Sequence, residues 1–157
     1  MPRRPYLTTR AHEAFSLAFD VARQHGEDEV TPLHLTVGIL REGRGVAVGM
    51  LHERGVPLDD VAQELEAVLQ TRPAVARANA SAYEWTPGAE RLVAAAQSEA
   101  RLLGTEYYGV EHLLLAMLRD EASASTQVVA RHRVRAADIE ADLRRLLGSV
   151  DEGESRR

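Results

Sequence analysis

The sequence of 157 residues contains no cysteine. Disulfides, thiolate nucleophiles and cysteine-ligated zinc or iron–sulfur sites are therefore excluded, and the composition fits a reducing compartment. Lysine is absent as well, so all 19 basic residues are arginine. Because a Walker A loop and Schiff-base catalysis both require a lysine, this sequence can form neither a P-loop ATPase site nor a lysine-dependent active site.

Aromatic residues make up only 4% of the sequence, whereas hydrophobic residues make up 45%. The core must therefore consist mainly of alanine, leucine and valine, which is typical of helix bundles. The net charge is −5, and no run of basic residues indicates a nucleic-acid partner. The longest apolar run, residues 113–118, is too short to span a membrane, and residues 1–5 lack the apolar segment of a signal peptide. We expect a cytoplasmic protein without nucleic-acid or membrane partners.

The strongest positive feature of the sequence is an internal repeat. Thr8–Leu69 aligns with Thr86–Leu147 at one constant spacing (86 − 8 = 78), without insertion or deletion. Identical residues recur throughout the two copies, and apolar positions keep their character. Because there are only two copies and each is long, the repeat favours a pseudo-symmetric pair over a solenoid.

Each copy has the apolar spacing of four helices. Thr8, Thr31 and Thr86 are expected helix caps, and the last two precede a proline, which suits the first helical position. The expected helices cover residues 8–26, 31–42, 46–53, 57–69, 86–103, 110–118, 123 or 125 to 132, and 136–147. No segment alternates with a period of two, so we expect no strands, and residues 106–108 are interpreted as a loop. We predict an all-α fold in which about eight helices form two pseudo-twofold-related four-helix repeats.

The domain boundaries follow from the repeat. Residues 1–6 are expected to form an N-terminal arm, and residues 7–147 one globular domain. Within this domain, repeat one covers 7–70, a polar and alanine-rich linker covers 71–84, and repeat two covers 85–147. The linker contains Pro73 and is expected to be mobile. The charged tail, residues 148–157, has no apolar face to bury and is predicted to be disordered.

Three motifs occur in a fixed order along the sequence. The repeats begin with related segments at Leu7–Ala11 and Trp85–Ala89. The second helix begins with Gly109–Leu115 in repeat two and with the related Val30–Leu35 in repeat one, and the turn at residues 41–47 reads REGRGVA. In order, spacing and duplication, these motifs resemble the N-terminal domain of the Clp (Hsp100) unfoldases, closest to the ClpC type. The resemblance covers residues 7–147.

The resemblance implies a non-enzymatic, monomeric module that needs no cofactor. It would bind Clp substrates, degrons or adaptor proteins for a hexameric ATPase ring. No ATPase module follows repeat two, which leaves two interpretations, an excised domain or a stand-alone protein, and the tail at residues 149–157 favours the second. Two alternative functions are a decoy that sequesters Clp-targeting cyclic-peptide antibiotics, and a regulator that docks on the Clp ATPase ring.

The resemblance also implies a site for phosphorylated arginine in each repeat, marked by a glutamate in the second-helix motif. Repeat two has this glutamate, Glu111, whereas repeat one has Leu33. A carboxylate suits the guanidinium group, and helix N-terminal amides suit the phosphate. We therefore expect ligand binding at Glu111 and a lost site at Leu33. The alternative role of Glu111 is a favourable charge in the first turn of its helix.

His34 and His112 occupy the same position in the two repeats, about three residues after a helix cap. A zinc site would require three or four ligands, so we assign both histidines a structural role, like the capping threonines, and expect no metal. The acidic residues elsewhere form no nucleophile–base pair, and we expect no catalytic residue and no enzymatic activity.

A further candidate surface lies at the entry and in the first helix of each repeat. The resemblance places this region near the pseudo-twofold seam, where it would bind peptides, adaptors or cyclic peptides. Trp85 is the expected exposed anchor, and the alternative is that these side chains fill the core. The residues of this surface are Leu7, Phe15, Phe19, Trp85 and Val93.

Overall fold

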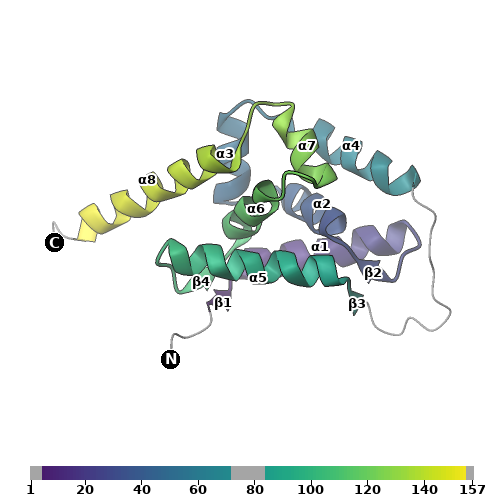
Figure 1. Ribbon diagram of the computed structural model, residues 1–157, viewed down its shortest axis with the longest axis horizontal. Helices are drawn as coiled ribbons and strands as arrows, with labels where there is room; N and C mark the ends of the chain where they lie inside the picture. The colour runs from purple at the N-terminus through teal and green to yellow at the C-terminus, as the bar shows by residue number, and fades with distance from the viewer. Residues whose placement is uncertain (1–4, 72–83, 155–157) are drawn as a thin grey trace.

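The computed structural model describes residues 5–71 and 84–154, with side chains described as far as residue 148. These residues form eight helices and four two-residue strands (Figure 1). The prediction of an all-α fold with two four-helix repeats is confirmed. The helices are α1 Thr9–Gln24, α2 Pro32–Glu42, α3 Val46–Glu53, α4 Leu58–Thr71, α5 Pro87–Leu102, α6 Val110–Arg119, α7 Ala124–Ala130 and α8 Ala136–Glu154; the strands are β1 Tyr6–Leu7, β2 Glu29–Val30, β3 Glu84–Trp85 and β4 Tyr107–Tyr108.

The helices begin where side-chain caps are available. Thr8 and Thr86 each accept the backbone N–H three residues ahead, at 3.2 Å, at the starts of α1 and α5. Thr31 caps α2 and Ser123 caps α7 in the same way. Each cap satisfies an amide that the helix cannot bond internally, which stabilises the protein by about 1 kcal/mol.

The expectation that the chain contains no strands was wrong. Parallel pairing joins β1 to β4 and β2 to β3, so the first strand of each repeat pairs with the second strand of the other repeat. Tyr107 and Tyr108, interpreted from the sequence as loop residues, form β4, and Tyr6 belongs to β1 rather than to a separate arm. Two residues are too few to show a period-two pattern, so the sequence carried no signal for these strands.

Helices α2 and α6 form the centre of the molecule (Figure 1). Residues 33–40 of α2 and 112–118 of α6 are all buried, so both helices are covered on every side by the other elements. Gly38 lets α2 approach α1 closely, because a Cβ atom at this glycine would lie 2.5 Å from the carbonyl oxygen of Ala14. The corresponding residue of α6 is Ala116, which cannot allow so close an approach to α5.

Ion pairs also connect the repeats at the far ends of their third helices. Arg54, at the end of α3, donates to both carboxylate oxygens of Asp142 in α8, each at 2.9 Å. In the related place of the other repeat, Arg131 at the end of α7 lies 2.8 Å from Glu64 in α4. The C-terminal part of α8 projects away from the other helices (Figure 1).

Helix α8 continues to Glu154, seven residues beyond the expected end at Leu147, so the prediction of a disordered tail from residue 148 was wrong for residues 148–154. No proline follows Leu147, and each of the two glycines in this stretch, Gly148 and Gly153, costs a helix only about 1 kcal/mol. The rest of the tail, the first four residues and most of the expected linker, residues 72–83, lie outside the described residues.

Candidate binding site at the start of α6

Glu111 is the second residue of α6, and its carboxylate folds back over the start of its own helix. The N-cap residue, Gly109, has no side chain that could cap the helix. A Cβ atom at Gly109 would lie only 2.7 Å from Oε2 of Glu111, so the carboxylate occupies the space that a capping side chain would use. The side chain of Glu111 is only 14% exposed. The carboxylate therefore lies against the free amides of the helix start, where negative charge is favourable.

The surroundings of Glu111 disfavour an isolated negative charge. Burial raises the pKa of its carboxyl group, and a bond to its own backbone N–H opposes this only in part. Burial, followed by the charge of Glu111, also raises the pKa of Tyr107. Within the part of the chain that the structure describes, no arginine pairs with Glu111, and His112 Nδ1 lies 3.8 Å from its Oε1. A desolvated carboxylate of this kind is suited to bind a cation.

The sequence did not single out Tyr107, whose hydroxyl group is influenced by the charge of Glu111, or Tyr6, which lies against Tyr107. The β1–β4 pairing places Tyr6 opposite Tyr107, with ring centroids 6.2 Å apart. The ring of Tyr107 also meets the imidazole of His112 edge-on at 5.5 Å. Tyr6 comes from repeat one, so only the strand exchange brings it to the site, and no local pattern in the sequence could have shown this.

The corresponding position of repeat one has no carboxylate. Leu33, the counterpart of Glu111, is 8% exposed and belongs to the core. Here Thr31 provides the cap of α2 with its own hydroxyl group. The start of α2 therefore offers no acceptor for a guanidinium group at this position.

His34 and His112 are both buried and make the same bond in both repeats. Nδ1 of His34 accepts the N–H of Thr31 at 2.9 Å, and Nδ1 of His112 accepts the N–H of Gly109 at 3.0 Å. On the other side of the ring, His34 Nε2 lies 2.8 Å from a carboxylate oxygen of Glu27, and His112 Nε2 lies 3.2 Å from the hydroxyl of Thr105. Burial lowers the pKa of His112 to about 4, although the charge of Glu99 opposes this. Among the described residues no group of side chains could hold a metal ion.

Three of the five residues of the candidate interaction surface form an aromatic cluster. Trp85 meets Phe15 edge-on at 4.9 Å and Phe19 edge-on at 5.8 Å. Phe15 is buried, and both Phe19 and Trp85 are half-buried against the core, so Trp85 is not the exposed anchor that was expected. The remaining two residues are also partly buried: Leu7 lies in the other strand pair, and Val93 in α5 is the repeat-two counterpart of Phe15.

Together these features describe an α-helical double repeat with a carboxylate at the start of one second helix. The chain belongs to the Clp repeat (R) N-terminal domain family, which matches residues 6–152. It is 29% identical over 143 residues to the chaperone protein ClpB of Oceanobacillus iheyensis, an alignment that covers 91% of this chain and 17% of that protein. It is 28% identical over 149 residues to the negative regulator of genetic competence ClpC/MecB of Bacillus subtilis, covering 95% and 18%.

The fold is similar to the crystal structure of the Hsp104 N-terminal domain from Candida albicans. The TM-score is 0.73 at 16% sequence identity, and the match covers 92% of this chain and 93% of that chain. The chain thus spans less than a fifth of the two curated relatives but almost all of a solved N-terminal domain. In the described part of the chain, no helix is long and apolar enough to cross a membrane.

Proposed function

We propose that this chain is a non-enzymatic module that binds protein segments in Clp-dependent proteolysis, and that Glu111 receives phosphorylated arginine. The observation that carries the proposal is the buried carboxylate of Glu111, which pairs with no arginine among the described residues and lies directly on the start of α6. The family to which the chain belongs, and relatives that include ClpC/MecB, support a role in this system.

The geometry suggests how such a ligand would bind. A guanidinium group would donate hydrogen bonds to the carboxylate of Glu111 and draw it away from the helix start. The backbone N–H groups of Val110 and Glu111 would then be free to bond the phosphate, which the helix dipole also favours. Because burial raises the pKa of Glu111, lowering the pH should protonate this carboxylate earlier than an exposed one and weaken binding.

The test is an isothermal calorimetric titration of the chain with a phosphoarginine peptide. Glu111→Gln keeps the shape of the side chain but removes its charge, and we expect it to weaken binding about tenfold or more. Glu90→Gln is the matched control, since Glu90 is an exposed carboxylate in the first turn of α5. Equal affinity of the wild type and Glu111→Gln would contradict the assignment, provided that circular dichroism shows unchanged helicity.

A second candidate function rests on the cluster of Phe15, Phe19 and Trp85. Half-buried aromatic rings can bind apolar cyclic peptides, as a decoy for Clp-directed antibiotics would require. Trp85 is the single tryptophan of the sequence, so its fluorescence reports on this surface alone. A saturable change in emission with a cyclic-peptide Clp inhibitor at micromolar concentration would support the decoy function, and an unchanged spectrum would reject it.

A further inference from the structure

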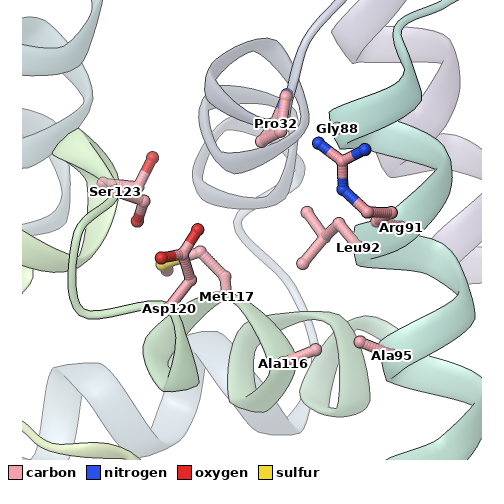
Figure 2. A pocket seen from close by; sticks show the side chains of 10 residues that line it. Pro32, Gly88, Arg91, Leu92, Ala95, Ala116, Met117, Asp120 and Ser123 are labelled. Atoms are coloured by element: carbon pink, nitrogen blue, oxygen red, sulfur yellow. The ribbon is translucent and has the colours of Figure 1, made fainter.

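A pocket of about 380 Å³ lies between α5, the end of α6 and the turn that leads to α7, with Pro32 at the start of α2 as a further lining residue. Figure 2 shows Arg91 on one side of this pocket and Asp120 with Ser123 on the other, with Leu92 and Met117 between them. No ion pair joins Arg91 or Asp120 to another residue in the described ranges. The pocket therefore combines an apolar floor with one charge of each sign at its edges. Its lining residues are Pro32, Gly88, Arg91, Leu92, Ala95, Ala116, Met117, Asp120, Ser123 and Ser125.

In repeat one, a half-exposed arginine side chain crosses the corresponding place. Arg10, the counterpart of Gly88, extends from the start of α1 to Glu42, and its Nη1 lies 3.4 Å from Oε1 of Glu42. On the way, its Cδ passes 3.2 Å from the position that a Cβ atom of Gly45 would take. Glu42 corresponds to Asp120 and Gly45 to Ser123. Arg10 thus contacts two positions whose counterparts line the pocket, and its own counterpart, Gly88, lines it as well.

The two carboxylates are held in the same way. Oε2 of Glu42 accepts the N–H of Arg44 at 3.1 Å, and Oδ1 of Asp120 accepts the N–H of Ala122, the counterpart of Arg44, at 3.3 Å. The second oxygen of Glu42 meets Arg10, which leaves the Glu42 side chain only 3% exposed. Asp120 has no arginine to cover it and is exposed. The loop thus presents Asp120 as an acceptor for a guanidinium group that repeat two does not itself contain at position 88.

We propose that this pocket binds an arginine side chain of another protein segment, in the place that Arg10 occupies in repeat one. The methylene groups of the ligand would pack on Leu92 and Met117, and its guanidinium group would pair with Asp120. Arg91 at the opposite edge selects an arginine that has an anionic group beside it, because a cation alone would be repelled. The site is separate from Glu111 and does not depend on the proposed function.

The minimal probe is N-acetyl-L-arginine, which carries a guanidinium group and one carboxylate. We expect its dissociation constant to be on the order of 1 mM, as is usual for a ligand of this size, with NMR shift changes at the amides of Gly88, Asp120 and Ala122. N-acetyl-L-citrulline has the same shape without the charge and should not bind. Asp120→Asn should weaken binding about tenfold.

The decisive variant is Gly88→Arg, which restores the arginine of repeat one. The new side chain should pair with Asp120, fill the pocket and abolish binding, while the melting temperature rises because arginine favours a helix more than glycine does. Binding is read only from the amides of Gly88, Asp120 and Ala122, which separates this site from the proposed phosphoarginine site at Glu111. Saturable binding that survives Gly88→Arg, or equal binding of the citrulline derivative, would overturn the proposal, as would the absence of any saturable shift.

Discussion

His34 and His112 take the place of the glutamate or glutamine of a usual capping box. Each accepts the N–H of its own N-cap residue through Nδ1, which satisfies an amide that the helix leaves free. An imidazole nitrogen can accept a hydrogen bond only while it carries no proton. The cap at the start of α6 therefore requires neutral His112, in agreement with the lowering of its pKa to about 4 by burial.

This requirement predicts a loss of stability at mildly acidic pH. In the unfolded chain His112 binds a proton near its ordinary pKa of 6.5, whereas in the folded protein it does so only near 4. The free energy of unfolding should therefore fall as the pH drops from 6.5 to 4, by about 3 kcal/mol from this residue, and be unaffected by it above pH 7. Urea unfolding at several pH values between 7 and 4 measures this slope.

His112→Gln is the control for this prediction. Glutamine at the third helical position can accept the same N–H from Gly109, but it does not titrate. The variant should remain folded and show a smaller loss of stability between pH 6.5 and 4 than the wild type. If both proteins lose the same free energy over this range, His112 is not the group responsible.

At the scale of helices, the closeness of α1 and α2 depends on Gly38. A Cβ atom there would lie 2.5 Å from the carbonyl oxygen of Ala14 and 3.0 Å from the amide nitrogen of Ala18, both parts of a rigid backbone. We expect Gly38→Ala to lower the free energy of unfolding by about 2 kcal/mol. The helices must move apart to admit the methyl group, and the packing energy lost exceeds the gain in helix propensity. Chemical denaturation measures the change.

Gly49 provides a matched control within another helix. It lies in α3, and a Cβ atom there would have no neighbour within 4 Å. Gly49→Ala should therefore raise the free energy of unfolding by about 0.5–1 kcal/mol through helix propensity alone. Destabilisation by both substitutions to a similar degree would show that the backbone contact at Gly38 is not the cause.

Most helices could be predicted from the sequence because their signals are local. Thr8, Thr31 and Thr86 mark caps, and the expected bounds of α3 agree with the structure. The strands could not be predicted, because β1 and β4 are two residues long and lie about a hundred residues apart in the chain. Long-range pairing of such short segments leaves no periodic trace.

The candidate sites were predictable only in part, for a similar reason. The internal alignment placed Leu33 opposite Glu111, but it could not show that the Glu111 carboxylate turns back over Gly109 or that Tyr107 adjoins it. The same alignment contained Gly88 opposite Arg10. That difference gains meaning only when the structure shows Arg10 crossing to Glu42.

At the scale of the whole molecule, the two repeats are interlocked rather than merely adjacent. Both strand pairs join different repeats, and so do the ion pairs of Arg54 with Asp142 and of Arg131 with Glu64. Helix α2 is buried on all sides, and part of that cover comes from α5, α6 and α7 of the other repeat. A single repeat would therefore expose much of its apolar surface to water, at a cost it cannot offset alone.

We predict that repeat one on its own, residues 1–71, folds only as a dimer. β1 corresponds to β3, and β4 corresponds to β2, so β1 of one copy can pair with β2 of a second copy in the way that β3 pairs with β2 in the full chain. Tyr6 would then lie opposite Glu29, where the full chain places Glu84, and the pairing of two like charges would be avoided. Analytical ultracentrifugation and circular dichroism should show helicity that increases with concentration together with dimer formation. A monomer that unfolds cooperatively at every concentration would contradict this prediction, because it would mean that one repeat can bury α2 without its partner.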